Sequence, residues 1–209
     1  MSERRAATEA PSKSEATRVK VLNAAARTLR AKGYAATTLN EIAEATDMRA
    51  GSLYYHFDSK EQLVEAVFEI GMQRVVDEVR SRVAALPPDA AFADRLSTAV
   101  QAHLEMMLLH GDYTSANIRI FGQVPKNLQR RQLRLRRAYG EYWRELLEAG
   151  QREGAIRKDA DLSIVRMLLF GALNWTVEWF DPRGKPVRAV ANEAANLVLQ
   201  GLLAAPAKR

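Results

Sequence analysis

The chain has 209 residues, of which 47% are hydrophobic and 27% charged, and this ordinary globular composition excludes collagen-like, coiled-coil-only and fully disordered proteins. It contains no cysteine, which excludes a disulfide scaffold, a thiolate metal site and a cysteine nucleophile. The formal net charge of +6 favours anionic partners, although bulk charge alone does not identify one.

The hydrophobic pattern predicts an all-α protein of about nine helices, because apolar residues recur with a period near 3.6 and strict alternation does not persist. The first four helices are expected at residues 14–32, 38–46, 49–57 and 58 or 59–86. The remaining five are expected at residues 89–109, 112–121, 125–153, 162–180 and 186–204.

These helices divide into three predicted segments. Residues 1–13 are expected to form a disordered tail, because they are polar and lack an apolar face. Residues 14–60 are expected to form a helix-turn-helix DNA-binding domain that extends into the fourth helix, to about residue 75. Residues 76–209 are expected to form a ligand-binding and dimerisation domain.

Two features bear on cellular location. The N-terminal residues 1–15 include no apolar run, so we expect no signal peptide, and the lack of cysteine fits a reducing cytoplasm. The longest apolar stretch, residues 164–180, is interrupted by Arg166, Asn174 and Glu178 and is short for a membrane span. We therefore expect a cytoplasmic protein in which this stretch forms a buried core or interface helix.

Capping and breaking residues set the expected helix boundaries. Gly33 stands where a glycine in the left-handed conformation commonly ends a helix. Thr38 and Glu41 have the spacing of a capping box, and Ser59 can start the fourth helix in the same way. The Pro87-Pro88 pair then ends the fourth helix.

The segment Thr37–Leu63 is the most informative part of the chain. It combines two short helices, of a size that suits the DNA major groove, with a new helix start. Leu53 and Phe57 lie one turn apart and are expected to be buried in a three-helix unit. Tyr54 and Tyr55 would then lie outside, where a tyrosine hydroxyl can bond a phosphate and its ring can pack on a sugar or a thymine methyl.

Two further residues fit this interpretation, and one alternative stands against it. Lys60 and the amides that start the fourth helix can form a phosphate cradle, and Thr38 can both cap its helix and touch a phosphate. In the alternative, Tyr54, Tyr55 and His56 line an ordinary helical core. The capped helix starts on both sides of the segment favour DNA reading.

The segment resembles the DNA-binding domain of the TetR family of bacterial transcriptional regulators. The resemblance covers about residues 15–70 and rests on Gly33-Tyr34, Thr37-Thr38, Ile42-Ala43, Gly51-Ser52-Leu53-Tyr54-Tyr55-His56-Phe57 and Lys60-Glu61-x-Leu63. It departs from the family at Asp47-Met48-Arg49, where the turn often has a glycine. The resemblance implies a homodimer that reads a partly palindromic operator. The positions that correspond to family DNA contacts are Thr38, Arg49, Ala50, Gly51, Ser52, Tyr54, Tyr55, His56 and Lys60.

The last two predicted helices suit a dimer interface. Residues 164–180 are apolar nearly all round, and such a helix must be buried on most faces. Residues 186–204 are rich in small side chains that let helices approach closely. Together they suit a four-helix interface between two copies, and the TetR resemblance implies the same pair. The alternative is an ordinary intramolecular core.

A pocket for a small-molecule effector is expected in the second domain, where methionine and aromatic side chains gather. Residues 119–137 also carry seven Lys or Arg and no acid. An apolar pocket beside these arginines would suit an amphiphilic anion such as an acyl-coenzyme A thioester, and the alternative is a solvated basic face. The candidate ligand residues are His103, Met106, Met107, Phe121, Arg130, Arg134, Tyr139, Trp143, Asn174, Trp175 and Trp179.

No catalytic motif occurs in the sequence, so we expect neither an enzyme nor a cofactor. No metal site is expected, since His103 and His110 lie about two helical turns apart, too far to share one ion within one helix. The sequence therefore predicts a ligand-responsive repressor, and residues 173–182 resemble TetR regulators of lipid or steroid catabolism. The alternatives are an architectural or ligand-independent DNA-binding protein and, less favoured, an enzyme. Ligand is expected to shift the fourth helix relative to the first.

Overall fold

The computed structural model describes residues 12–109 and 111–202, and within these residues the chain forms nine α-helices and no strand, as predicted. None of the described helices combines the length and the apolar character that a membrane crossing requires. The helices are α1 (Lys13–Ala36), α2 (Leu39–Glu44), α3 (Ala50–Tyr54), α4 (Lys60–Ala84), α5 (Phe92–Leu108), α6 (Asp112–Ile120), α7 (Lys126–Arg152), α8 (Leu162–Trp179) and α9 (Val187–Leu202).

Local capping accounts for several of these boundaries. Ser12 and Thr38 each form a capping box, and the Ser59 hydroxyl accepts from the amide of Gln62, so the predicted starts of α2 and α4 are confirmed. Gly33 has a φ of 80°, the left-handed conformation expected there, and α1 continues for a short further turn after this kink.

Three predicted boundaries need correction. α1 starts at Lys13, so the last two residues of the predicted tail belong to the helix and its cap, while residues 1–11 lie outside the described residues. α3 ends at Tyr54 instead of Phe57, because the chain must turn back to reach the cap of α4. α5 starts at Phe92 instead of residue 89, because a turn bonding the Ala90 amide to the Pro87 carbonyl precedes it.

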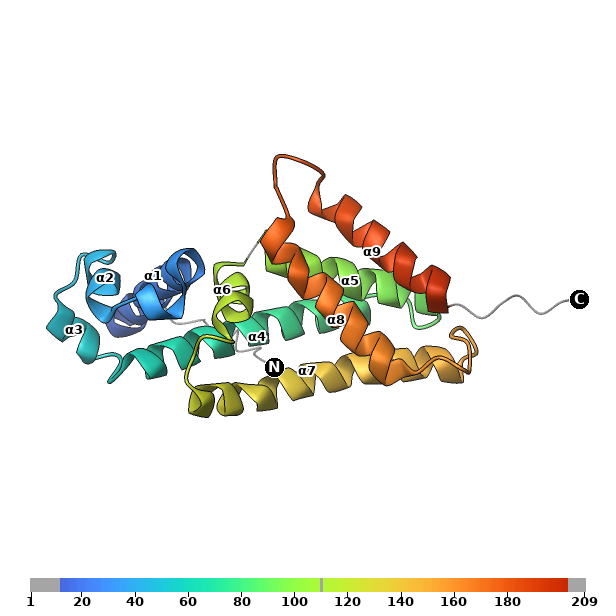
Figure 1. The fold of residues 1–209 in the computed structure, drawn as a ribbon, viewed down its shortest axis with the longest axis horizontal. Coiled ribbons are helices and arrows are strands. Elements are labelled where there is room, and N and C mark those ends of the chain that lie inside the picture. Colours follow the sequence, from blue (N-terminus) through green and yellow to red (C-terminus); the bar gives the residue numbers. More distant parts are fainter. Residues whose placement is uncertain (1–11, 110, 203–209) are drawn as a thin grey trace, which may run out of the picture.

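The helices are arranged along the length of the molecule (Figure 1). α1, α2 and α3 form a small group at one end, and α4 runs from this group into the main body. There α7 lies along the lower side of the view, α5 packs on α4, α8 runs between α5 and α7, and α9 covers the opposite side. α6 stands between the small group and the main body, beside α1 and α4.

Two apolar cores hold the helices together, and α4 belongs to both. Its first half places Leu63 and Phe68 in the core of the small group, and its second half places Val75 and Val79 in the core of the main body. The core of the small group also includes residues from α6, from the connection after it and from the start of α7, namely Tyr113, Ala116, Ile120, Val124 and Leu128. The N-terminal unit is therefore packed directly on a helix of the second block.

Candidate functional site

The α2–α3 pair forms a rigid helix-turn-helix unit. Leu53 and Phe57 are fully buried against the rest of the small group, as predicted, and Leu39 and Met48 pack against the same core. The turn between the helices places Asp47 in the left-handed region, at a φ of 56°. Asp tolerates this conformation better than most residues, so the turn closes without the glycine often found there.

The opposite surface of α3 faces solvent. Tyr54 is 51% exposed and Tyr55 is 85% exposed, so the alternative in which these rings line a helical core is wrong. Arg49, which precedes α3, is exposed as well, whereas His56 is half-buried and packs edge-on against Tyr55. Exposed Gly51 and Ser52 and half-buried Ala50 complete this polar, small-residue face. A face of this composition on a short, buried-backed helix can enter a major groove.

Lys60 is fixed at the start of α4. Its ammonium donates to the carbonyl of Tyr34 at 2.5 Å and lies 4.1 Å from the centre of the Tyr34 ring. The Tyr34 hydroxyl in turn donates to Glu61 at 2.8 Å, and burial together with this carboxylate raises the pKa of Tyr34 to about 12. Burial lowers the pKa of Lys60, while Glu61 and Glu41 partly offset this effect. Lys60 thus presents a positioned charge at the start of α4, and the exposed Thr38 caps α2.

α6 is attached to the group formed by α1, α2 and α3 by polar contacts as well as by its apolar face. The Arg30 guanidinium pairs with Asp112 at 2.8 Å, and the Tyr113 hydroxyl donates to Asn23 at 2.7 Å. The carbonyl oxygen of the Gln123 side chain, just after α6, accepts from the Tyr34 amide at 2.9 Å. These contacts hold α1 and the α6 region together as one piece.

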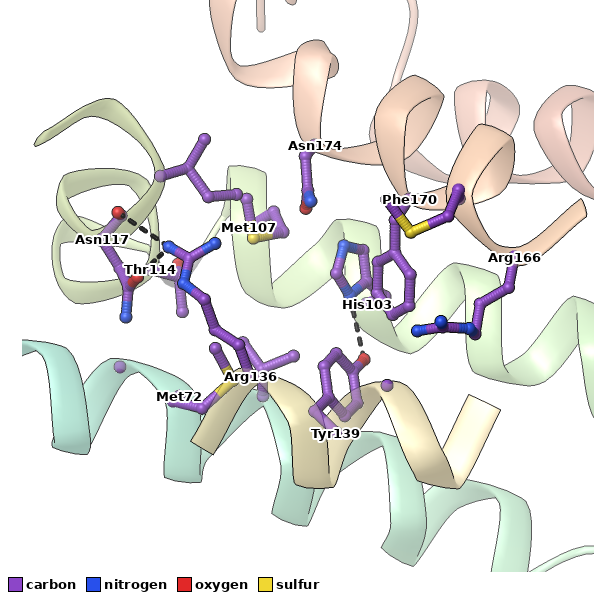
Figure 2. Close-up of a pocket in the computed structure, with 15 residues that line it drawn as sticks. Met72, His103, Met107, Thr114, Asn117, Arg136, Tyr139, Arg166, Phe170 and Asn174 are labelled. Carbon is purple, nitrogen blue, oxygen red and sulfur yellow. Dashed lines mark hydrogen bonds between the residues drawn. The ribbon is translucent and has the colours of Figure 1, made fainter. Parts of the chain in front are cut away.

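A cavity of about 230 Å³ lies on the other side of α6, lined by residues of α4, α5, α6, α7 and α8. Figure 2 shows side chains from these helices converging on it. Four of the predicted ligand residues line it: His103, Met107, Tyr139 and Asn174. The remaining lining residues are Gly71, Met72, Val75, Thr114, Asn117, Ile118, Arg136, Gly140, Arg166, Met167 and Phe170.

His103 lies at the centre of the cavity wall. Only 2% of the residue is exposed, and its Nδ1 lies 3.0 Å from the Tyr139 hydroxyl, the contact drawn in Figure 2. Burial lowers the pKa of His103 to about 4, a shift that the neighbouring Asn174 amide partly opposes, so the imidazole is neutral at pH 7. Its Nε2 atom has no hydrogen-bond partner among the described residues. Burial also raises the pKa of Tyr139.

Two arginines reach the cavity from different helices. Arg136 of α7 donates to the side-chain and main-chain oxygens of Asn117, at 2.6 and 3.2 Å, and its guanidinium lies 3.8 Å from the centre of the Phe121 ring. Burial lowers the pKa of Arg136 to about 10, which leaves it charged at neutral pH. Arg166 of α8 packs over Gly140, where an added Cβ would lie 2.7 Å from its Nη1 atom.

Family models match both halves of the chain. Residues 21–67 match the model described as bacterial regulatory proteins, tetR family, and residues 89–202 match the tetracyclin repressor-like C-terminal domain. The chain belongs to the TetR family of transcriptional regulators. The expectation raised by the TetR-like segment is therefore confirmed, and the helix-turn-helix unit is a DNA-binding domain.

Similar proteins span nearly the whole TetR-family chain. The HTH-type transcriptional repressor KstR2 of Rhodococcus jostii is 30% identical over 193 residues, covering 88% of this chain and 90% of the relative. The fatty acid metabolism regulator protein of Bacillus subtilis is 22% identical over 188 residues, covering 88% and 94%. The structure of the ketosteroid transcriptional regulator KstR2 of Mycobacterium tuberculosis shares the fold, with a TM-score of 0.78, 24% identity and coverage of 96% and 100%.

The other predicted ligand residues of this TetR-family chain lie outside the cavity lining. Met106 and Trp143 are buried in the surrounding core, and the ring of half-buried Phe121 packs against the guanidinium of Arg136. Arg130 is exposed on α7, and Arg134, also exposed, borders a separate groove between α4 and α7 that contains Glu65 and Glu69. Trp175 and Trp179 are 65% and 54% exposed on the outer face of α8.

The arginines of the cavity were the part of the site that the sequence did not single out. Arg136 belongs to the predicted basic run, but the run contains several arginines. Only its position on the same helix face as Tyr139 distinguishes Arg136 from the others. Tyr139 and Arg136 are three residues apart and therefore share a helix face. Arg166 offered a signal as well, because it is a charge within the apolar stretch 164–180.

α8 and α9 leave an apolar surface uncovered in the single chain. Within α8 only Leu169, Leu173 and Thr176 are buried, so the prediction of burial on most faces does not hold for one copy of the chain. An intramolecular core is also the wrong explanation for the outward-facing side chains. The exposed large apolar residues of these two helices are Ile164, Met167, Leu168, Trp175, Trp179 and Leu197.

Proposed function

We propose that this protein is a repressor that binds a partly palindromic operator as a homodimer and leaves it when a small molecule occupies the cavity of each subunit. The observation that carries the proposal is the position of α6 between the cavity and the DNA-binding domain. One side of this helix lines the cavity through Thr114 and Asn117, and the other side is fixed to the DNA-reading end through Asp112 and Tyr113. A ligand that moves α6 must therefore strain or break the contacts between α6 and α1.

Contact with DNA is assigned to the exposed surface around α3. Tyr54, Tyr55, Arg49 and Ser52 are free to reach bases or phosphates, and Lys60 supplies a charge at the N-terminus of α4. The half-buried Ala50 and His56 and the exposed Thr38 and Gly51 remain candidates at its edges. Repression takes place where the chromosome lies, which for a bacterial regulator is the cytoplasm.

The homodimer is assigned to α8 and α9. An exposed apolar surface that includes two tryptophans is unfavourable in water and is typical of a protein interface. Two copies related by a two-fold axis would bury this surface and place the two α3 helices on the same side of a duplex. The side chains that support the assignment are Ile164, Leu168, Trp175, Trp179 and Leu197.

The effector is assigned to the class of small hydrophobic or acyl-coenzyme A-like molecules. The methionine, valine and aromatic side chains of the cavity suit an apolar chain or ring system. KstR2 and the fatty acid metabolism regulator are relatives of this chain, and their names concern ketosteroids and fatty acids. A small hydrophobic effector and an acyl-coenzyme A-like effector would each place an apolar body in the cavity, and the two differ in their polar end. Movement of α4, which shares both cores, would accompany that of α6.

A selection experiment tests the proposal. The full-length protein would be used to enrich duplexes from a random library, and binding of the enriched sequence would be followed by fluorescence anisotropy over a range of salt concentrations. We expect two half-sites related by a dyad, about 10 base pairs or a multiple apart, and an affinity that falls steeply with salt. Equal binding of all duplexes in the library would favour an architectural DNA-binding protein and contradict the proposal of an operator-specific repressor.

A further inference from the structure

The cavity is lined by two arginines and a histidine and by no acidic residue. Among the buried polar atoms without a partner are Nε of Arg136, Nε of Arg166 and Nε2 of His103, and all three residues line the cavity. None of the lining residues is an aspartate or glutamate, and no described carboxylate pairs with either arginine.

The tautomer of His103 follows from its one partner. The Tyr139 hydroxyl has no other acceptor among the described residues, so its proton is assigned to Nδ1 of His103. The neutral ring then carries its own proton on Nε2, which is a donor. His103 is 98% buried in the cavity wall, where Nε2 is covered and Asn174 of the cavity lining is a polar neighbour of the ring.

Stability does not explain the two arginines. Moving a guanidinium out of water is unfavourable unless an anion or a full set of acceptors compensates it. Arg136 has only the neutral Asn117 oxygens and the Phe121 ring as partners, and half-buried Arg166 pairs with no described carboxylate. A guanidinium whose pKa is lowered by burial and that has no counter-ion, as at Arg136, is typical of a site whose partner is a ligand.

The two guanidinium groups reach the cavity from α7 and α8, on opposite sides of it. Gly140 follows Arg136 by one helical turn on α7, and the missing side chain at Gly140 leaves the space that Arg166 Nη1 occupies. In Figure 2 Arg136 and Arg166 approach from either side of His103 and Tyr139. Apolar Met72, Met107 and Phe170 occupy the rest of the wall.

We propose that the effector is a free carboxylic acid with an apolar body, and that the guanidinium groups of Arg136 and Arg166, which line the cavity, supply the positive charge that binds its carboxylate. This inference rests on the proposed function and specifies the polar end of its effector. A carboxylate supplies the anion that the cavity lining lacks, and guanidinium groups match its planar geometry. The volume of about 230 Å³ is below the roughly 300–1,000 Å³ of typical drug-sized pockets, which favours a compact acid over a whole coenzyme A thioester.

The test compares three ligands that share one apolar chain. Straight-chain carboxylates from hexanoate to tetradecanoate would be titrated into the full-length protein by calorimetry, beside the alcohol and the coenzyme A thioester of each chain length. We expect the best carboxylate to bind at least about tenfold more tightly than its alcohol and its thioester. Arg136→Met and Arg166→Met should each remove this preference, and Arg130→Met, on the exposed face of the same α7 helix, should keep it.

A second measurement separates ligand binding from a structural role. If the arginines serve the ligand, Arg166→Met should leave the melting temperature of the ligand-free protein nearly unchanged, because half-buried Arg166 forms no hydrogen bond or ion pair with a described residue. A lower melting temperature together with unchanged carboxylate binding would overturn the proposal. So would tighter binding of the thioester, or no binding of any carboxylate at about 1 mM. Operator binding by the same samples distinguishes these outcomes from a failure of the proposed function.

Discussion

The guanidinium of Arg136 and the side-chain oxygen of Asn117 are joined by a hydrogen bond of 2.6 Å, which links a cavity residue of α7 to the middle of α6. Asn117 is buried, and its amide nitrogen donates to the Phe68 carbonyl of α4 at 3.0 Å. The Asn117 side chain of α6 thus contacts both α7 and α4, and α4 leads into the DNA-binding domain. A ligand anion that draws Arg136 away would break the hydrogen bond between Arg136 and the Asn117 side chain and leave the one between Asn117 and Phe68.

Replacing Asn117 should therefore uncouple the cavity from the operator. Asn117→Ala leaves Arg136 and the Phe68 carbonyl without these partners, so we expect a loss of about 1–3 kcal/mol in the free energy of unfolding. Operator affinity without ligand should remain close to that of the wild type, and release by ligand should weaken. Denaturation and anisotropy with and without ligand measure the two effects.

Asn127→Ala, at an exposed position on α7, is the matched control and should change neither quantity. Full ligand-induced release in Asn117→Ala would show that Asn117 is not part of the coupling.

The exposed ring of Tyr55 should contribute to DNA binding and little to stability. Because Tyr55 is 85% exposed, Tyr55→Ala should change the free energy of unfolding by less than about 0.5 kcal/mol. Operator affinity should fall about tenfold or more, since a phosphate or base contact is lost. Anisotropy with the selected duplex and thermal unfolding provide the readouts. Equal operator affinity in the variant and the wild type would remove Tyr55 from the interface.

Lys60 should act through its charge on the phosphate backbone. Lys60→Ala is expected to weaken binding to all duplexes alike and to reduce the slope of log affinity against log salt by about 1. The hydrogen bond to the Tyr34 carbonyl is lost as well, so a small decrease in melting temperature is expected. Lys185→Ala, in the exposed loop between α8 and α9, is a control with the same change of charge. An unchanged salt slope in Lys60→Ala would contradict a phosphate contact.

His103 should make stability depend on pH. The pKa of His103 is about 4 in the folded chain and about 6.5 for an unperturbed histidine, so between these values the unfolded chain binds the extra proton. Stability should therefore rise with pH across this window, by an amount of roughly 3 kcal/mol at most, and fall as the pH decreases from about 6.5 to about 4. His103→Gln should reduce this dependence, measured as the difference in melting temperature between the two ends of the window. His56→Gln is the matched control, and the same difference in both variants would assign the effect elsewhere.

The helices and the DNA-reading face could be predicted because their signals are local. Capping pairs such as Thr38 with Glu41, and the one-turn spacing of Leu53 and Phe57, fix structure over a few residues. The short extent of α3 was missed because the turn after Tyr54 depends on where α4 must begin. Propensity within the segment does not contain that information.

The cavity could be predicted only in part because its residues meet across the chain. His103, Met107, Tyr139 and Asn174 were identified by residue type, but nothing in the sequence places Arg136 against Asn117 or Arg166 against Gly140. In the sequence, Trp175 and Trp179 cannot be distinguished from aromatic residues that line a cavity. Only the packing of α8 shows that they face outward. Helix rotation, set by tertiary contacts, decides between these outcomes.

The outward face of α8 should control assembly. Trp175→Glu and Leu168→Glu each place a charge in the proposed interface, where desolvation of the carboxylate opposes association. We expect the dimer dissociation constant to rise by about 100-fold or more and operator affinity to fall with it, because a single α3 helix reads only one half-site. Light scattering coupled to gel filtration measures the assembly. Leu133→Glu, on partly exposed α7, introduces the same charge outside this surface and should remain dimeric. Dimers of unchanged stability in both α8 variants would place the interface on another face of the molecule.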